Sequence, residues 1–173
     1  LVGGGGHSKV IIDIIKGENQ FDIKGITEKD KKGQVLDIPV IGNDAILNHI
    51  YQNGIKNAFV CIGAIDNTKI RNNIFDNLKA IGFKIPVLIH KTSIVSTYSK
   101  LGEGTCIMAG AIINPDTNIG KNCVINTGAI IEHDCKIGDN VQISPGTVIS
   151  GGVTIGKDSF IGANSTIIQG VKI

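Results

Sequence analysis

Two adjacent residues in the second half of the chain, His133 and Asp134, place an imidazole beside a carboxylate. A neutral imidazole near pH 7 is the usual group to remove a proton from an attacking amine or hydroxyl. A neighbouring carboxylate can fix the tautomer of the ring and raise its basicity. These residue types in this order therefore indicate a general base.

A second group of residues, near the start of the chain, could bind an anion. A run of glycines, Gly3 to Gly6, precedes His7 and leads into the apolar stretch Val10 to Ile15. Glycines let the backbone approach a phosphate, and the N-terminus of a following helix offers free N–H groups and a positive dipole end. The pattern predicts a strand, a phosphate-binding turn and a helix. Ser8 stands where the full dinucleotide fingerprint has its third glycine, so a tight turn without a ligand is the alternative.

The element that must position the His133–Asp134 pair is a repeat of six residues. An aliphatic residue stands at every sixth position from Ile89 to Ile173, and the fifth place of each hexad holds a small or β-branched residue. This period is typical of a stacked β-solenoid, in which each short strand turns one large and one small residue inward. His133 takes the third place of its hexad, which points outward. We expect a corner without room for a Cβ just after the aliphatic residue, at Gly102, Gly120, Gly138, Gly156 and Gly162.

The sequence pattern of the first half of the chain is typical of a small α/β domain. Strands that alternate with helices imply a parallel sheet, and the length suits half of a dinucleotide-binding fold, which would hold one nucleotide. The predicted domains are 1–88 and 89–173. We expect strands over 21–26, 57–62 and 84–88, a loop with a turn over 35–42, a helix over 44–54 capped by Asn43, and a helix over 66–82 with Ile70, Ile74, Leu78 and Ile81 on one face.

Composition and charge narrow the class of protein. A net charge of +2 with 18% charged residues gives no large single-sign field, so neither nucleic acid nor an anionic membrane is an expected partner. The sequence shows no apolar run of membrane-spanning length and no signal pattern, so we expect no membrane insertion and a cytoplasmic location. The four cysteines lack metal-ligand spacing, so we expect buried thiols and no metal. Ile173 begins an unfinished hexad, which indicates a truncated C-terminal end.

Two motifs give the chain a specific family resemblance. They are Gly4-Gly5-Gly6-His7 and the stretch from Ile125 to Gly138, which includes Glu132-His133-Asp134-Cys135. With them, essentially the whole chain resembles the NeuD/PglD-type sugar acetyltransferases of the hexapeptide-repeat acyltransferase superfamily. The resemblance implies a Rossmann-like α/β half domain that binds a nucleotide sugar, followed by a catalytic left-handed parallel β-helix of roughly five triangular coils that binds acetyl-CoA. It also implies a homotrimer, with the coenzyme A groove between neighbouring subunits.

The resemblance further implies a reaction and a role for individual residues. Family members transfer the acetyl group of acetyl-CoA to a bacterial surface sugar, several of them at the C4 amine of a UDP-linked amino sugar. On this resemblance His133 is the general base and Asp134 increases its basicity. The amide of Gln142 would hydrogen-bond the thioester oxygen where relatives often have a histidine. The implied sugar and nucleotide contacts are Gly5, Gly6, His7, Gly63 and Asn126, and acetyl-CoA would lie along the solenoid near Gly151, Gly152 and Ala163.

Other functions stay open at this point. Many relatives read the nucleotide base with an Asp-Asp pair after the second strand, whereas this chain offers a single acidic residue such as Glu28, so the nucleotide is open too. An O-acetyltransferase acting on a sialic acid or a related sugar would use the same base. A non-catalytic nucleotide-sugar-binding protein would keep the glycine-rich turn without needing His133. A metal-dependent hydratase with the same solenoid needs three histidine ligands, whereas the solenoid holds His90 and His133.

Overall fold

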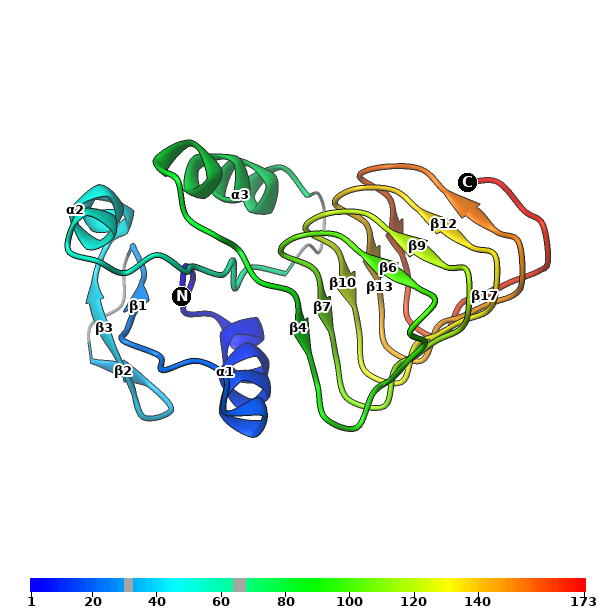
Figure 1. The fold of residues 1–173 in the computed structure, drawn as a ribbon, viewed down its shortest axis with the longest axis horizontal. Helices are drawn as coiled ribbons and strands as arrows, with labels where there is room; N and C mark the ends of the chain where they lie inside the picture. The colour runs from blue at the N-terminus through cyan, green and yellow to red at the C-terminus, as the bar shows by residue number, and fades with distance from the viewer. Residues whose placement is uncertain (30–32, 64–67) are drawn as a thin grey trace. The chain divides into compact units, whose positions relative to one another are not determined.

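Short strands in the first half of the chain build an α/β unit (Figure 1). The computed structural model describes residues 1–29, 33–63 and 68–173, and the first of its two compact units comprises Leu1–Gly63 and Lys69–Pro86. In this unit β1 (Ile26–Thr27) pairs in parallel with β3 (Ile38–Gly42), whereas β2 (Gln34–Val35) pairs antiparallel to β3.

Single parallel bridges extend this sheet beyond β1. Val2 bridges both Thr27 and Val60, and Asn57 bridges Lys84. The parallel segments therefore lie in the order β3, β1, Val2, the segment 57–60 and Lys84, which corresponds to the order 3-2-1-4-5 of a doubly wound sheet. In such a sheet a ligand binds beyond the carboxyl ends of the strands, where the winding reverses. Here that place adjoins the glycine-rich turn.

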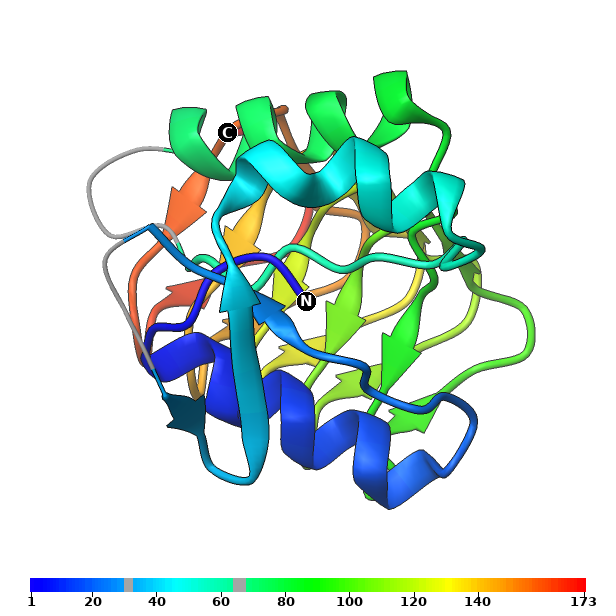
Figure 2. The same cartoon turned by 90° about the vertical axis from the view of Figure 1, so that its left-hand side faces the viewer.

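Helices cover both faces of the sheet. Figure 2 shows α1 (Gly6–Glu18) on one side and both α2 (Leu47–Gln52) and α3 (Lys69–Ile81) on the other. The short 3-10 helix η1 (Asp44–Ile46) leads into α2. Its cap is the predicted one, because the side chain of Asn43 accepts a hydrogen bond from the backbone N–H of Ala45 at 3.0 Å.

Several strand predictions in this unit are wrong. The stretch 35–42 forms the β2–β3 hairpin instead of a loop, with Leu36 in a left-handed conformation at its turn (φ 53°). The strand expected over 21–26 is reduced to β1 at its end. The segments 57–62 and 84–88 contribute single bridges to the sheet, because each meets its neighbour over too short a length for a ladder.

The helix expected over 66–82 is α3, and the start of that prediction lies outside the described residues. The buried side chains of α3 are Arg71, Phe75 and Leu78. Ile70, which we expect in the core, is 62% exposed. The inward stripe is therefore rotated from the predicted one: Phe75 faces the core, and Arg71, one turn earlier, shares its direction.

The second compact unit contains Val87–Ile173 and is a stacked β-solenoid, as the six-residue repeat predicts, in the form of the left-handed parallel β-helix that the family resemblance implies. Each strand pairs with the strand 18 residues further on, as Ile125 does with Ile143, so three hexads make one coil (Figure 1). The domain boundaries that we predict from the sequence, 1–88 and 89–173, stay a prediction.

The strands of the solenoid form three sheets, which we name after their first strands. The β4 face holds β4 (Leu88–Ile89), β7 (Cys106–Ile107), β10 (Val124–Ile125), β13 (Gln142–Ile143) and β16 (Phe160–Ile161). The β5 face holds β5 (Ile94–Val95), β8 (Ile112–Ile113), β11 (Ile130–Ile131), β14 (Val148–Ile149) and β17 (Thr166–Ile167). The β6 face holds β6 (Lys100–Leu101), β9 (Asn118–Ile119), β12 (Lys136–Ile137) and β15 (Thr154–Ile155).

The core of the solenoid is the stack of first-place aliphatic residues. From Ile107 to Ile167 each of them is at most 8% exposed. The fifth-place side chains fill the remaining space, and those that are polar are satisfied by the backbone: the hydroxyl of Thr117 donates to the carbonyl of Glu132 at 2.9 Å. A buried hydroxyl without a partner would cost about 1–3 kcal/mol, so the small polar residues fit this place because a carbonyl lies within reach.

The corners of the coils depend on the fourth place of each hexad. From Gly104 to Gly170 every fourth-place residue has a φ between 54° and 72°, and all of them are Gly, Asn or Asp, which tolerate this left-handed conformation. The glycine that follows the aliphatic residue is needed for another reason. A Cβ on Gly138 would lie 2.6 Å from the backbone nitrogen of Lys157 in the next coil. The prediction of a corner without room for a Cβ is confirmed at Gly102, Gly120 and Gly138, because neighbouring coils approach closely there. It is wrong at Gly162, where the nearest atom to a Cβ, the hydroxyl oxygen of Ser165, lies at 3.7 Å.

Candidate active site

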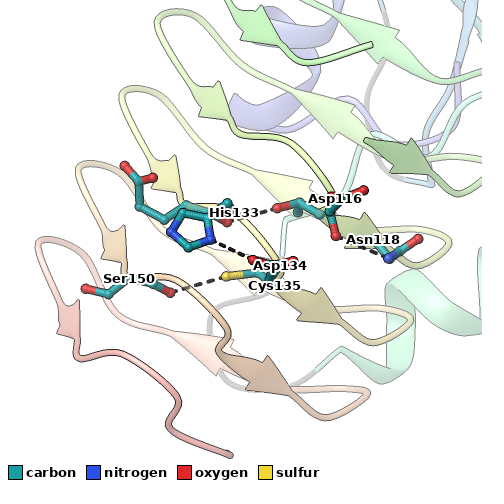
Figure 3. Close-up of polar contacts among 8 residues, drawn as sticks. Asp116, Asn118, His133, Asp134, Cys135 and Ser150 are labelled. Atoms are coloured by element: carbon teal, nitrogen blue, oxygen red, sulfur yellow. Dashed lines mark hydrogen bonds and ion pairs between the residues drawn. The ribbon is translucent and has the colours of Figure 1, made fainter. Parts of the chain in front are cut away.

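The β5–β6 corner, the turn from the β5 face to the β6 face, carries the His133–Asp134 pair (Figure 3). The Nδ1 atom of His133 lies 2.7 Å from Oδ2 of Asp134. Asp134 is a fourth-place residue with φ 62°, and its backbone N–H donates to the carbonyl of Pro115 in the preceding coil at 3.2 Å. This tight turn brings the carboxylate back to the ring. Both side chains are more than 60% exposed (62% and 64%), so a reactant can reach the ring.

The carboxylate of Asp134 controls the protonation of His133. Its hydrogen bond raises the pKa of His133 above the ordinary value, a smaller effect of desolvation lowers it, and the charges of Asp134 and Glu132 raise it further. When Nδ1–H donates to the carboxylate, Nε2 of the neutral ring carries a lone pair. The pair therefore has the arrangement needed to accept a proton from an attacking nucleophile.

Gly151 lies against the His133 ring. It follows His133 by one coil, and a Cβ placed on it would stand 2.8 Å from Cε1 and 2.9 Å from Nε2 of the imidazole. The two coils are also joined here by the backbone, because the N–H of Gly152 donates to the carbonyl of His133 at 2.9 Å. Sequence reasoning places Gly151 near acetyl-CoA but misses its contact with the ring, which the spacing of 18 residues could have revealed.

The other solenoid residues predicted to bind substrate or coenzyme lie elsewhere on the coil. Asn126 and Ala163 belong to the β4–β5 corner, the turn from the β4 face to the β5 face. Gln142 opens β13, the strand that leads into the same corner. Within one chain the structure therefore groups Gly151 with His133 and separates both from these three residues.

A groove of about 500 Å³ runs over the outer face of β6, β9 and β12. Lys100, Asn118 and Lys136 line it together with the stacked glycines that follow each strand. Because β12 follows the β5–β6 corner directly in the chain, the groove lies on the face that adjoins this corner. Sequence reasoning does not single out these lysines, because each is an ordinary outward residue of its own hexad.

The second group of predicted residues lies at the carboxyl ends of the parallel segments in the first unit. The glycine-rich turn, Glu28 and Gly63 each follow one of these segments. The N–H of Gly4 donates to Oε2 of Glu28 at 2.6 Å. A Cβ on Gly3 would lie 2.7 Å from the side chain of Ile62, the neighbour of Gly63. The structure therefore brings the turn together with both of the other strand ends.

The backbone at the start of α1 is open to a ligand. Gly5 is the N-cap, and among the described residues no side chain caps this helix. Apart from their neighbours in the chain and in the helix, no atom of the described residues lies within 4 Å of a Cβ placed on Gly5 or Gly6. Free N–H groups and the positive end of the helix dipole favour an anion at this point. Ser8, which replaces the third glycine of the fingerprint, is fully buried and donates its hydroxyl to the carbonyl of Gly5 at 2.6 Å.

His7 is a partly buried, neutral histidine beside this turn. Burial, with a smaller contribution from the positive charge of Arg71, lowers the pKa of His7 to about 4. Its buried Nε2 atom makes no hydrogen bond to the described part of the chain, so it can still donate to or accept from a ligand. Arg71, 2% exposed on α3, is a neighbour that sequence reasoning misses. The apolar stripe predicted for this helix does not include Arg71, so the sequence alone gives no signal for it.

The cysteines and the acidic side chains add no further site. Cys61, Cys106, Cys123 and Cys135 are free and buried, as predicted. Across the described ranges, no three His, Cys, Asp or Glu side chains are grouped so that they could hold a metal ion. None of the described helices is both long and apolar enough to cross a membrane.

Family models match both units of the chain. The PglD N-terminal domain matches residues 1–78, and the bacterial transferase hexapeptide model of six repeats matches 98–133, 116–151 and 134–169. PerB from Caulobacter crescentus, solved with CoA and GDP-perosamine, is 31% identical with a TM-score of 0.86, over 99% of this chain and 88% of that one. The chain belongs to the NeuD/PglD-type sugar acetyltransferases of the hexapeptide-repeat superfamily.

Two other solved structures resemble this NeuD/PglD-type chain. The acetyltransferase domain of PglB from Neisseria gonorrhoeae, in complex with acetyl coenzyme A, is 27% identical with a TM-score of 0.82, over 99% of this chain and 92% of that one. WeeI from Acinetobacter baumannii is 16% identical with a TM-score of 0.66, over 97% and 93%, a likeness that shows the fold alone. No curated protein matches the chain.

His7 makes the stability of this family member depend on pH. Its folded pKa of about 4 lies below the ordinary value of 6.5, so the unfolded chain binds more protons between these limits. The contribution of neutral His7 to the free energy of unfolding is complete above about pH 6.5 and is lost as the pH falls towards 4. From pH 7 to pH 4 we expect the parent to lose up to about 3 kcal/mol more free energy of unfolding than His7→Gln. Urea denaturation at both pH values measures this, with His49→Gln as the control, and equal losses in parent and His7→Gln would contradict it.

Asp134→Asn should lower the pKa of His133 towards its ordinary value, because the variant removes the carboxylate that raises it. Asparagine tolerates the left-handed φ of this place, so the corner should keep its shape. Asp116→Asn is a matched control, since Asp116 holds the fourth place at the same corner one coil earlier with φ 58°. The ring protons of His133, followed by NMR against pH, report the pKa. An equal fall in both variants would mean that general charge, rather than the hydrogen bond, controls His133.

Proposed function

We propose that this NeuD/PglD-type enzyme transfers the acetyl group of acetyl-CoA to the amine, at C4, of a nucleotide-linked amino sugar. We place the reaction in the cytoplasm, in bacterial surface-glycan synthesis. The observation that carries the proposal is the hydrogen-bonded His133–Asp134 pair at an exposed corner of the solenoid. The likeness to PerB with CoA and GDP-perosamine, and to the PglB domain with acetyl coenzyme A, supports both substrates.

His133 acts as the general base of the transfer. Acetyl-CoA provides an activated acetyl group and a thiolate that can leave. Nε2 of His133 takes a proton from the amine of the sugar while the amine nitrogen bonds to the acetyl carbon. The bond from that carbon to the sulfur of coenzyme A breaks. The ring then returns the proton to the thiolate. Asp134 holds the Nδ1–H edge and stabilises the positive charge that the ring carries between these two steps.

The residues near the β5–β6 corner fit a coenzyme A donor. The groove lies on the β6 face, which follows the corner of His133 along the chain, and the glycines that end its strands add no side chains to it. Lys100 and Lys136 offer ammonium groups to the phosphates of the donor. We therefore assign this groove to the donor, with its thioester end towards the corner.

The acceptor nucleotide fits the first unit. The open N–H groups of Gly5 and Gly6 suit its phosphates, and the neutral His7 and the backbone of Gly63 lie at the same strand ends. Glu28 is held at the glycine-rich turn by the N–H of Gly4. Its remaining acceptor capacity suits a ribose or base donor.

A homotrimer would bury an exposed apolar surface of the solenoid. The outward residues of the first four strands of the β5 face are apolar, and only the last, Thr166, is polar: Ile94 is 65% exposed, and Ile112, Ile130 and Val148 are partly exposed. The matching row on the β6 face is polar, with Lys100, Asn118 and Lys136. An exposed apolar row of this kind favours association between copies of a chain.

This packing would also complete the active site. When three β5 faces surround a threefold axis, the β5–β6 corner of one subunit meets the β4–β5 corner of the next. His133 and Gly151 would then face Asn126 of the partner subunit, with the partner's Gln142 and the partner's Ala163 close by. We propose that the site residues separated within one chain come together in this way.

Acetyl transfer to a panel of acceptors tests the proposed function. We expect thiol release from acetyl-CoA with a GDP- or UDP-linked 4-amino sugar, and a fall of about 10²–10⁴-fold in kcat for His133→Ala, the usual contribution of a general base. Binding of acetyl-CoA should be retained in this variant. His90→Ala, which removes the other solenoid histidine, is the control.

The same panel separates the alternatives. Thiol release with free sialic acid alone would move the chain to O-acetylation, and nucleotide-sugar binding without thiol release would identify a non-catalytic binding protein.

Mixing two inactive variants tests the composite site. We expect His133→Ala and Asn126→Ala, unfolded together and refolded as mixed trimers, to regain activity, because one interface in each mixed trimer pairs an intact His133 with an intact Asn126 of the partner subunit. The mass by sedimentation equilibrium should be three times the 18.2 kDa of the chain. A monomeric mass, or mixed trimers as inactive as their parents, would contradict this arrangement.

A further inference from the structure

The β5–β6 corner has a buried glycine under the imidazole of its general base. Gly151 and His133 occupy the same third place in successive coils, 18 residues apart. A Cβ placed on Gly151 would lie 2.8 Å from Cε1, 2.9 Å from Nε2 and 3.3 Å from Nδ1 of His133. Gly151 is buried at this surface corner although His133 is exposed. The ring therefore lies with one face on the backbone of Gly151.

The ring is what requires a glycine at this position. Gly152, the next residue, has a left-handed φ of 69°, but Gly151 does not, so its backbone suits any L-residue. All three atoms nearest to the missing Cβ belong to the His133 side chain. Pro115, one coil before His133, and Gln169, one coil after Gly151, hold the same place in their coils and both carry side chains. Neither the backbone conformation of Gly151 nor its place in the stack of coils therefore excludes a Cβ.

We infer that Gly151 is a positioning residue, which fixes the plane of the His133 imidazole for proton transfer. Asp134 holds the ring at its Nδ1 edge, at 2.7 Å, and Gly151 supports one face. These two contacts hold an exposed side chain in one orientation and leave Nε2 as the nitrogen that Asp134 does not engage. The inference rests on the proposed role of His133 as general base and extends it to a residue of the next coil.

Gly151→Ala tests this positioning role without straining the backbone. The new Cβ must displace the ring by several tenths of an ångström, and misplacement of this order costs up to about 10²-fold in rate. We expect kcat to fall about 10²-fold while KM for both substrates stays within about threefold of the parent. Because the ring is pushed from Asp134, the pKa of His133 should fall, and the acidic limb of the pH profile of kcat/KM should move to lower pH.

Gly162→Ala is the matched control. Gly162 has no left-handed φ, and the nearest atom to its missing Cβ is the hydroxyl oxygen of Ser165 at 3.7 Å. This variant should keep the kcat and the His133 titration of the parent.

A double-mutant cycle gives a readout that does not depend on activity. Gly151→Ala should lower the thermal unfolding midpoint in the parent but not in a His133→Ala background, where the clashing ring is absent. If Gly151→Ala alone fails to fold, the double variant should restore the folded state. Equal destabilisation in both backgrounds would overturn the inference, as would a folded Gly151→Ala with the kcat and His133 titration of the parent.

Two further outcomes are separable. A raised KM for acetyl-CoA with an unchanged titration would make Gly151 a donor contact and would also overturn the inference. A parent that transfers no acetyl group would refute the proposed function, while the titration and the unfolding cycle would still decide the positioning role.

Discussion

The parallel register between coils, in which each residue pairs with the residue 18 positions further on, governs the solenoid. Ile125 pairs with Ile143, and Ile131 pairs with Ile149. Equivalent places therefore stack on one another, and a requirement that holds in one coil holds in the next. The aliphatic core, the glycines between coils and the left-handed fourth places all follow from this register. A large side chain such as His133 can lie along the column because the next coil has no side chain there.

The same register organises polar groups at the β6–β4 corner, the turn from the β6 face to the β4 face. The side-chain N–H of Asn122 donates to Oδ1 of Asn140 at 2.9 Å, and that of Asn140 donates to Oδ1 of Asp158 at 3.0 Å. These fourth-place residues satisfy one another along the axis of the solenoid. Asp134 has the same backbone conformation at the β5–β6 corner, but its carboxylate turns to His133. One backbone position thus serves packing at one corner and supports chemistry at another.

The sequence predicts the solenoid well and the first unit less well, for a physical reason. A solenoid strand is two residues long and recurs in every hexad, so the aliphatic signal accumulates over many coils. In the first unit, sheet segments such as those at Val2 and Val60 make single bridges, and their short apolar runs carry little periodic information. The left-handed conformation of the fourth place is hard to predict from the sequence, because Gly, Asn and Asp share a backbone preference rather than a polarity. Arg71 is hidden because its neighbours come from elsewhere in the fold.

The candidate site divides in the same way. His133 and Asp134 are adjacent in sequence, so their contact can be predicted without a fold. The contact of His133 with Gly151 needs the coil length, and the effect of Arg71 on His7 needs the tertiary structure. For Asn126 and Gln142 the sequence separation from His133 is short, yet the triangular coil places them around a different corner. Closeness along the chain is therefore a poor guide to closeness in a solenoid, where a coil spreads neighbouring hexads over three faces.

The choice of aspartate at position 134 follows from two requirements at once. The left-handed φ of the fourth place favours Gly, Asn and Asp, and every other side chain is strained there by roughly 1–2 kcal/mol. Raising the basicity of His133 needs a carboxylate, which excludes Gly and Asn. Glutamate would satisfy the second requirement but not the first, and its longer side chain would have to fold back to reach Nδ1. Aspartate meets both, because the turn that demands its backbone conformation also brings its short carboxylate to 2.7 Å from the ring.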